Sequence, residues 1–185
     1  MKKRVFIIHG WEGAPGKNWM PWLKTELEKK GYEVIVPTMP NADAPKIDAW
    51  VAHLSKVVGT PNEGVYFIGH SIGCQAILRY LEKLDQPVGG AVFVAGWFNL
   101  ENLEDAESIK IADPWINTPI DISKVKKILP KSTLIISEND SYGALKENID
   151  KFSQFVSHTV VLPNAGHITQ AQELAVLSQF MNLVQ

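Results

Sequence analysis

Cysteine is the scarcest residue in this 185-residue chain. Cys74 is the single cysteine, so no disulfide can form within the chain. Neither Cys nor His occurs in pairs at metal-ligand spacing, so we expect no structural zinc site, and we expect no cofactor. The chain also has no large excess of charge of either sign, because its formal net charge is −2. Without the basic stripe that a phosphate backbone requires, nucleic acid is not an expected partner.

Long hydrophobic runs are absent too. No stretch approaches the roughly 18 consecutive apolar residues that a membrane-spanning helix needs. The chain starts with basic residues, but the apolar run that follows them, residues 5–8, ends at His9. That run is too short for the core of a secretory signal peptide. The sequence therefore predicts a cytoplasmic protein.

Hydrophobic residues make up 45% of the chain, and they include six tryptophans and seven phenylalanines. This is enough for one substantial core, so residues 1–185 are expected to form a single domain. Six short runs rich in β-branched residues are nearly continuously hydrophobic, which indicates strands covered on both faces. They are residues 4–8, 33–37, 65–69, 91–95, 133–137 and 159–163.

Segments with helical periodicity separate these runs. In the first, Trp19, Leu23 and Leu27 repeat every four residues, with Asn18 as the expected N-cap and Gly31 as the stop. Further apolar stripes occupy residues 47–54, 77–84, 145–152 and 174–184. Strand and helix alternate about six times, which predicts a three-layer α/β/α fold around a mostly parallel six-stranded sheet.

Residues 97–121 depart from this pattern, because they show no clear period and hold six acidic residues against one lysine. One interpretation is the rim of a substrate pocket that favours a neutral or cationic leaving group. The other is a solvated loop whose carboxylates keep the surface soluble. Under the first interpretation, the apolar walls would come from five aromatic residues: Trp11, Trp19, Trp97, Phe98 and Trp115.

The most informative motif is Gly69-His70-Ser71-Ile72-Gly73, which follows an apolar run and precedes a periodic helix. A G-x-S-x-G sequence in this context is typical of a sharp strand-to-helix turn that exposes the serine oxygen. Side chains at Gly69 and Gly73 would collide with the neighbouring helix and strand. The motif predicts Ser71 as a nucleophile, while Cys74, one turn later, is expected only to pack as a small buried hydrophobe.

A serine hydroxyl needs a base to take its proton. Five histidines are available: His9, His53, His70, His158 and His167. Only His167 falls in a short loop between the last expected strand and the last expected helix, over the same sheet edge as Ser71. We therefore predict His167 as the base, while His9 is expected to shape its loop.

The acid that orients the base should follow a strand between Ser71 and His167, because this architecture uses the chain order serine, acid, histidine. Residues 137–140 offer Glu138 and Asp140. Asp140 lies deeper in the loop and is the predicted acid, with Asp113 as the fallback. A turn-forming or helix-capping carboxylate is the alternative interpretation of Asp140.

The tetrahedral intermediate also needs hydrogen-bond donors for its oxyanion. The backbone N–H of Ile72, directly after the nucleophile, is one expected donor. The other should come from the loop after the first strand, where Trp11 N–H is the best candidate. Gly10 and Gly13 would let this loop approach closely.

Four separated motifs now coincide: HGWEG at 9–13, GHSIG at 69–73, SEND at 137–140 and AGH at 165–167. Together they resemble the α/β-hydrolase superfamily, in a minimal form without a large lid. The G-H-S-x-G motif in so short a chain resembles the compact serine hydrolases named after retinoblastoma-binding protein 9. That resemblance likewise implies Ser71 as nucleophile, Asp140 as acid and His167 as base. The retinoblastoma-binding L-x-C-x-E segment is missing, because QAIL follows Cys74.

The sequence thus predicts a serine hydrolase, similar to a carboxylesterase, that cleaves small acyl esters or amides through an acyl-enzyme on Ser71. It implies a small-molecule acyl substrate and no particular oligomeric state. One alternative is a catalytically weak binding or regulatory module that keeps the hydrolase fold. Another is acyl transfer or a lyase reaction at the same three residues.

Overall fold

A computed structural model describes residues 2–170 and 173–185; the side chains of Glu173 and Leu174 lie outside the described part. Its centre is one parallel sheet with the strand order β2-β1-β3-β4-β5-β6. The strands are β1 (Arg4–Ile8), β2 (Glu33–Ile35), β3 (Val65–His70), β4 (Gly90–Val94), β5 (Ser132–Ser137) and β6 (His158–Leu162). All six lie within two residues of the predicted runs.

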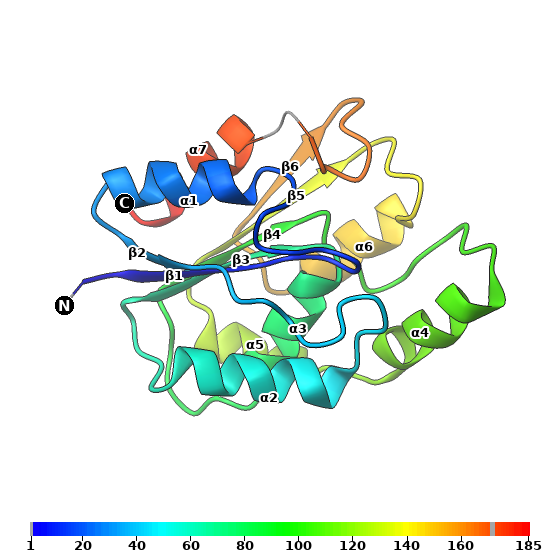
Figure 1. Ribbon diagram of the computed structural model, residues 1–185, viewed down its shortest axis with the longest axis horizontal. Helices are drawn as coiled ribbons and strands as arrows, with labels where there is room; N and C mark the ends of the chain where they lie inside the picture. The colour runs from blue at the N-terminus through cyan, green and yellow to red at the C-terminus, as the bar shows by residue number, and fades with distance from the viewer. Residues whose placement is uncertain (1, 171–172) are drawn as a thin grey trace.

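The described part of the chain holds seven helices, and six of them cover the sheet and form the outer two layers of the three-layer fold. Two of them, α1 (Met20–Lys29) and α7 (Glu173–Leu183), lie side by side on one face (Figure 1). The other face carries α2 (Ile47–Val58), α3 (Ile72–Leu81), α5 (Ile122–Ile128) and α6 (Leu145–Phe152). The predicted α/β/α architecture is therefore confirmed.

The core has two parts, one on each side of the sheet. Beneath α1 and α7, residues such as Leu23, Leu27 and Phe180 are buried against β1 and β4. On the opposite face, the side chains of α2 and α3 pack with Phe67 and Phe93 of the central strands. Every residue of β3, β4 and β5 is buried, as continuous hydrophobic runs predict for strands covered on both sides. The edge strand β6 is only partly covered, and Val161 is 41% exposed.

The order of the strands determines where a site can form. After β1 the chain moves outward to β2, and then returns to place β3 on the other side of β1. The loops that follow β1 and β3 therefore diverge at the carboxyl ends of two adjacent strands. In open α/β sheets, ligands bind at such a switch point. Ser71 follows β3 and Trp11 follows β1 at this position.

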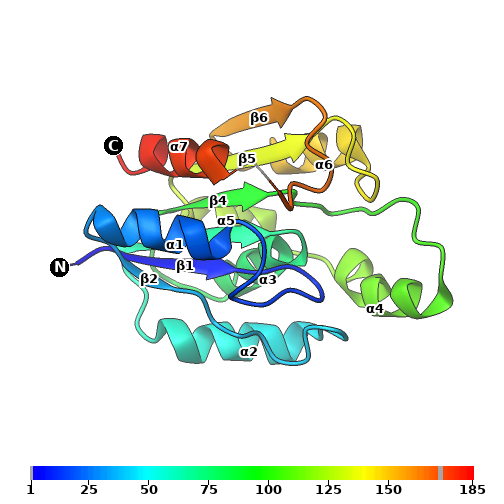
Figure 2. The ribbon, with the colours of Figure 1, turned by 45° about the horizontal axis from the view of Figure 1, so that its top comes forward.

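Two local features differ from the sequence pattern. Residues 97–121, which show no clear period, contain α4 (Ala106–Asn117), which lies beyond the carboxyl ends of the strands (Figure 2). Asp105 caps α4 by accepting a hydrogen bond from the Ser108 N–H at 2.7 Å. Asn18 does not cap α1: Trp19 holds that position, while Asn18 has a positive φ of 57°. Gly31, with φ of 89°, follows the end of α1 as expected.

None of the helices in the described ranges has the length and apolar character that crossing a membrane would require.

Candidate active site

Ser71 occupies a sharp turn between β3 and α3. Its backbone has φ of 54° and ψ of −125°, a conformation that costs a non-glycine residue about 1–3 kcal/mol. Its N–H donates to the Val94 carbonyl at 2.9 Å, which ties the turn to the neighbouring strand. A Cβ on Gly69 would lie 2.9 Å from the Cys74 nitrogen, and one on Gly73 would lie 2.5 Å from the Ile8 carbonyl oxygen. Both glycines are thus required by close packing, as the motif predicted.

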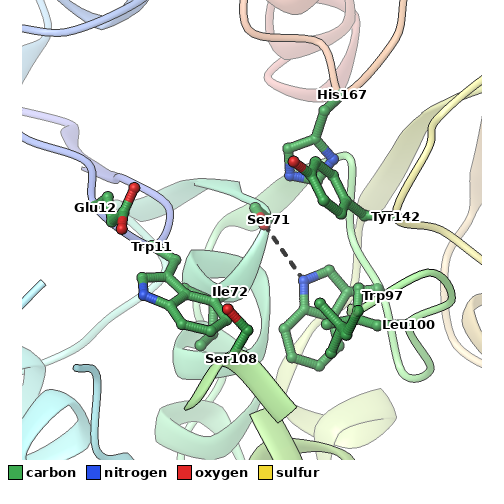
Figure 3. Close-up of a pocket in the computed structure, with 10 residues that line it drawn as sticks. Trp11, Glu12, Ser71, Ile72, Trp97, Leu100, Ser108, Tyr142 and His167 are labelled. Carbon is green, nitrogen blue, oxygen red and sulfur yellow. Dashed lines mark hydrogen bonds between the residues drawn. The ribbon is translucent and has the colours of Figure 1, made fainter. Parts of the chain in front are cut away.

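A cavity of about 230 Å³ opens above this turn (Figure 3). Ser71 and His167 both line it, although they are far apart in the sequence. Its remaining walls come from the loop after β1, the start of α3, the segment from 97 to 108 and Tyr142. The lining residues are Trp11, Glu12, Ser71, Ile72, Trp97, Leu100, Leu103, Ser108, Tyr142 and His167.

His167 and Asp140 form a close pair at the rim of this cavity. The Nδ1 atom of His167 lies 2.8 Å from Oδ2 of Asp140, and the Asp140 side chain is only 5% exposed. A carboxylate accepts hydrogen bonds, so Nδ1 carries the proton and donates it. Nε2 is then left with a free lone pair, which is the form that a general base needs.

The second carboxylate oxygen of Asp140 is also occupied. Its Oδ1 accepts the backbone N–H of Tyr142 at 3.0 Å, so Asp140 shapes a turn and also holds the histidine. The geometry is compatible with both interpretations of Asp140. Glu138 is exposed, and Asp113 lies on the exposed side of α4, where it accepts from the Asn117 amide. Neither competes with Asp140 for His167.

Two ring N–H groups hold the loop that carries His167. Nε2 of His70 lies 2.9 Å from the carbonyl oxygen of His167, and because a carbonyl only accepts, His70 donates. The indole N–H of Trp19 donates to the next carbonyl, that of Ile168, also at 2.9 Å. Ile168 has a positive φ of 51°, which is unfavourable for a β-branched residue. The two donors stabilise this strained backbone and thereby fix the direction of the imidazole.

His70 is uncharged in this position. It is 3% exposed, and burial, followed by its neighbour His167, lowers its pKa to about 4. The two rings lie edge to face, with centroids 5.1 Å apart. A cationic His70 would oppose the positive charge that His167 gains when it takes a proton. A neutral His70 holds the loop of the predicted base without that penalty.

The acid loop and the histidine loop are joined by further hydrogen bonds. Oδ1 of Asn139 accepts from the Gly166 N–H at 2.9 Å and from the Ser137 hydroxyl at 2.9 Å. The Ser137 oxygen in turn accepts from the Ala165 N–H at 3.0 Å. These contacts bring the ends of β5 and β6 together, so the spacing between Asp140 and His167 is built into the backbone.

The hydroxyl of Ser71 points to Trp97 rather than to His167. Its Oγ accepts from the indole N–H of Trp97 at 3.3 Å, while the His167 imidazole lies on the other side of the serine (Figure 3). This is the one hydrogen bond that the hydroxyl makes within residues 2–170 and 173–185. Hydrogen bonds of a catalytic serine are often long or misaligned without substrate. Rotation about the Cα–Cβ bond of Ser71 turns the hydroxyl away from Trp97.

Two backbone N–H groups beside Ser71 have no acceptor in the described part of the chain. They belong to Trp11 and Ile72, the predicted oxyanion donors, and both residues line the cavity. A Cβ on Gly10 would lie 3.2 Å from the Ser71 Cβ, so the loop after β1 does approach the serine closely. His9 shapes this loop: it is fully buried, its Nδ1–H donates to the Gly10 carbonyl, and its Nε2 accepts the Met39 N–H.

Some expectations about the pocket walls were wrong. Trp19 is buried on the α1 side and holds the His167 loop instead of lining the cavity. Phe98 and Trp115 line a separate cavity. Residues 97–121 do contribute to the wall, but through apolar and hydroxyl side chains, and none of their six acidic residues lines the cavity. The solvated-surface interpretation of these carboxylates is therefore favoured.

Sequence reasoning also missed the supporting roles of four residues. They are Trp19, His70, Ser137 and Asn139. The role of His70 could have been suspected from the sequence, because His70 directly precedes Ser71 and therefore lies at the same end of the strand as the nucleophile. For the others the partner is a backbone atom on a distant loop, which no local pattern identifies.

Comparison with known proteins agrees with this geometry. Residues 5–185 match the protein family described as "Serine hydrolase". YdeN, a protein of Bacillus subtilis (strain 168) that is named as a hydrolase, is 28% identical over 172 residues, which cover 92% of this chain and 88% of YdeN. The crystal structure of the B. subtilis ydeN gene product superposes with a TM-score of 0.87 at 26% identity, over 98% of both chains.

More distant structures share the fold. Est1E from Butyrivibrio proteoclasticus superposes with a TM-score of 0.75 at 13% identity, over 98% of this chain and 87% of Est1E. The resemblance to proteins named after retinoblastoma-binding protein 9 stays a prediction, which these relatives do not test. With a family match that spans nearly the whole sequence and a serine at the turn between β3 and α3, the chain belongs to the serine hydrolase family, with an α/β-hydrolase fold.

Proposed function

We propose that this serine hydrolase cleaves small carboxylic esters through an acyl-enzyme on Ser71. The observation that carries the proposal is the 2.8 Å hydrogen bond between Asp140 and His167, at the rim of the cavity that Ser71 lines. This arrangement supplies an oriented base and a nucleophile that lines the cavity, at one sheet edge. The proposed roles are Ser71 as nucleophile, His167 as base and Asp140 as the orienting acid.

Acylation begins when the Ser71 hydroxyl leaves Trp97 and turns to Nε2 of His167. The imidazole takes the hydroxyl proton while Oγ forms a bond to the ester carbonyl carbon. The carbonyl oxygen becomes an oxyanion, which the N–H groups of Trp11 and Ile72 stabilise; loss of one such donor typically costs about 3–4 kcal/mol. The Asp140 carboxylate stabilises the imidazolium. His167 then gives its proton to the leaving alcohol oxygen as the bond between carbon and that oxygen breaks.

Deacylation repeats these steps with water. His167 takes a proton from a water molecule, whose oxygen attacks the acyl carbon on Ser71. The second tetrahedral intermediate uses the same two N–H donors. When it collapses, the carboxylic acid is released and the proton returns from His167 to Oγ of Ser71.

The cavity supports a small substrate with an apolar acyl or alcohol part. It measures about 230 Å³, and indole and leucine side chains form much of its wall: Trp11, Trp97, Leu100 and Leu103. An ester rather than an amide is the better-supported substrate class. Structures that share the fold include a protein described as a monoacylglycerol lipase of Paleococcus ferrophilus, and Est1E of Butyrivibrio proteoclasticus with ferulic acid bound.

The test is hydrolysis of p-nitrophenyl acetate, butyrate and octanoate by the wild-type protein and by Ser71→Ala. Wild-type turnover that falls by at least about 10³-fold in Ser71→Ala, with the fold unchanged by circular dichroism, supports the proposal. Equal turnover by both proteins contradicts it. Parallel assays with the matching anilides measure the preference for esters over amides.

One observation favours the second candidate, a binding or regulatory module with weak catalysis: the Ser71 hydroxyl is hydrogen bonded to Trp97 and not to His167. A fluorophosphonate probe separates the two functions, because it modifies only a serine that its base activates. A stoichiometric mass shift on Ser71 that requires His167 supports the enzyme. A folded protein that stays unmodified supports the binding module.

A further inference from the structure

A second cavity, also of about 230 Å³, lies on the α3 side of the sheet and is separate from the one that Ser71 lines. Four helices and the chain between them converge on it. Its wall comes from α3, the segment after β4, the end of α4, the start of α5 and the region of α6. The residues are Gln75, Arg79, Phe98, Trp115, Ile116, Thr118, Pro119, Ile120, Ile122, Lys151 and Gln154.

The charges that face this cavity are all positive. Arg79 and Lys151 line it, and no Asp or Glu does. Arg79 is only 2% exposed, and its guanidinium lies 5.9 Å from the centroid of the Trp115 ring. The Glu82 carboxylate acts on it from a longer range, but no carboxylate in the described part of the chain lies within ion-pair distance of it. A buried charge without a partner is unfavourable by several kcal/mol in general, so proteins normally pair it. An Arg buried beside a hollow is therefore unusual.

Part of the guanidinium has a structural role. Nη2 of Arg79 donates to the carbonyls of Trp115 at 2.8 Å and Thr118 at 2.7 Å, which lie at the carboxyl end of α4. A cation at a helix carboxyl terminus is favourable. A guanidinium has five N–H groups, however, and Nε is buried with no acceptor in the described structure. Capping α4 uses one nitrogen and leaves the rest of the positive charge beside the cavity.

Gln75 is the second polar residue with an unused atom here. It lies one turn before Arg79 and one turn after Ser71, on the same side of α3. Its Nε2 donates to the Trp97 carbonyl at 2.8 Å, but its Oε1 is buried and has no partner in the described part of the chain. The residue itself is 1% exposed. Two nearly fully buried polar side chains thus line one cavity with hydrogen-bonding capacity left over.

The remaining walls are apolar. Phe98, Trp115 and Ile116 form part of them, with Ile120 and Ile122. A hydrated inorganic anion would gain nothing from such walls, whereas a hydrocarbon or aromatic group would be removed from water on them. The combination of cationic groups with apolar walls selects an amphiphilic anion.

We propose that this second cavity binds a small organic carboxylate, whose charged group lies against Arg79 and whose hydrocarbon part packs on the apolar walls. Lys151 adds a second positive charge at the rim. A planar carboxylate matches the fork of N–H groups on a guanidinium. A ligand that also carries a hydroxyl can donate to Oε1 of Gln75. The inference does not depend on the proposed ester hydrolysis.

The experiment measures benzoate binding by calorimetry at low ionic strength in a buffer without carboxylates. Benzamide is the matched neutral probe. The informative variant is Lys151→Glu, because Lys151 is exposed and its replacement leaves the core intact. Lys127→Glu is the control: Lys127 is also exposed, lies on α5 and lines neither cavity. Arg79→Met, checked for folding by circular dichroism, removes the buried charge.

We expect benzoate to bind the wild-type protein and Lys127→Glu with equal affinity, and benzamide to bind at least fivefold more weakly. Lys151→Glu should raise the benzoate Kd at least fivefold, and a folded Arg79→Met should show no binding. Benzoate binding that Lys151→Glu leaves unchanged would place the ligand elsewhere, including the Ser71 cavity, and would overturn the proposal. Equal binding of benzamide and benzoate, or no binding of benzoate to the wild-type protein, would overturn it as well.

Discussion

The side chain of His70 donates a hydrogen bond to the backbone of His167, across 97 residues of sequence and over a distance of 2.9 Å. The donor immediately precedes the proposed nucleophile, and the acceptor carries the proposed base. One hydrogen bond therefore links the turn that exposes Ser71 to the loop that positions His167. Because this bond joins the two segments directly, a shift of the His167 loop should also move His70 and the turn that carries Ser71.

Replacement of His70 by Phe should lower kcat while KM stays nearly constant. The ring volume is kept, but the His167 carbonyl loses its donor and the base shifts; misplacement by about 1 Å can cost up to 100-fold in rate. We expect a loss of about tenfold or more in kcat for p-nitrophenyl butyrate. His70→Gln, which keeps an N–H donor, should recover part of it. His158→Phe on the exposed edge strand is the control. A His70→Phe variant with wild-type kcat would contradict the positioning role.

The same histidine should make folding sensitive to acid. Burial lowers the pKa of His70 from 6.5 to about 4, so between these values the unfolded chain binds a proton that the folded one does not. The free energy of unfolding therefore does not depend on His70 above about pH 6.5. As the pH falls from there toward 4, protonation of His70 in the unfolded chain lowers this free energy by on the order of 3 kcal/mol. Urea unfolding at pH 7 and 4.5 should show a larger loss for the wild-type protein than for His70→Phe. Equal losses would mean that His70 does not carry this dependence.

Asp140→Asn should reduce kcat strongly, because an amide can present its N–H to Nδ1 and favour the wrong tautomer of His167. In well-studied Ser-His-Asp enzymes this change costs about 10⁴-fold in kcat. We expect a loss of at least about 100-fold here. Glu138→Gln is the matched control, since Glu138 is two residues away and exposed. Comparable losses in the two variants would contradict the assignment of Asp140.

The sequence predicts those features of the structure that nearby residues determine. The strands could be placed because short, continuous runs of β-branched residues, such as those of β1 and β5, are typical of strands in a sheet that is covered on both faces. Ser71 could be placed because Gly69 and Gly73 are demanded by contacts with α3 and β1, which the motif itself encodes. Asp140 and His167 followed from their positions after β5 and β6, since parallel strands bring those ends to one edge.

The parts that could not be predicted depend on tertiary contacts. α4 begins at a good N-cap, Asp105, but it buries only Ala112 and Trp115. The partners of Trp115, which are Pro45 and Arg79, are distant in sequence. The hydrogen bond from Trp97 to Ser71 joins the ends of β4 and β3, and nothing in the local sequence around Trp97 indicates it. The second cavity likewise arises only where four helices meet.

The turn itself should tolerate no side chain at Gly73. A Cβ there would lie 2.5 Å from the Ile8 carbonyl oxygen and 2.7 Å from that of His9, both backbone atoms that cannot move aside cheaply. Gly73→Ala should therefore lower the free energy of unfolding by about 2 kcal/mol or more. Gly16→Ala is the control, because a Cβ on Gly16 would meet no other atom within 4 Å. Similar urea midpoints for the two variants would contradict the close approach of α3 to β1.

Trp97→Phe should make Ser71 react faster with a fluorophosphonate. The indole N–H donates to Oγ of Ser71 at 3.3 Å, and it occupies a lone pair of the oxygen that has to attack the probe. A neutral hydrogen bond contributes about 1 kcal/mol net, so its removal should raise the second-order labelling rate by about two- to fivefold. Phe keeps an aromatic wall for the cavity.

Trp22→Phe serves as the control, because Trp22 is a half-buried residue of α1 that lines neither cavity. Labelling is followed by intact-mass spectrometry at several probe concentrations, so that the rate reports the reactivity of Ser71 before any substrate specificity enters. If Trp97→Phe reacts more slowly than both the wild-type protein and Trp22→Phe, the indole N–H assists the serine instead of restraining it. In that case Trp97 would belong to the machinery that activates the hydroxyl.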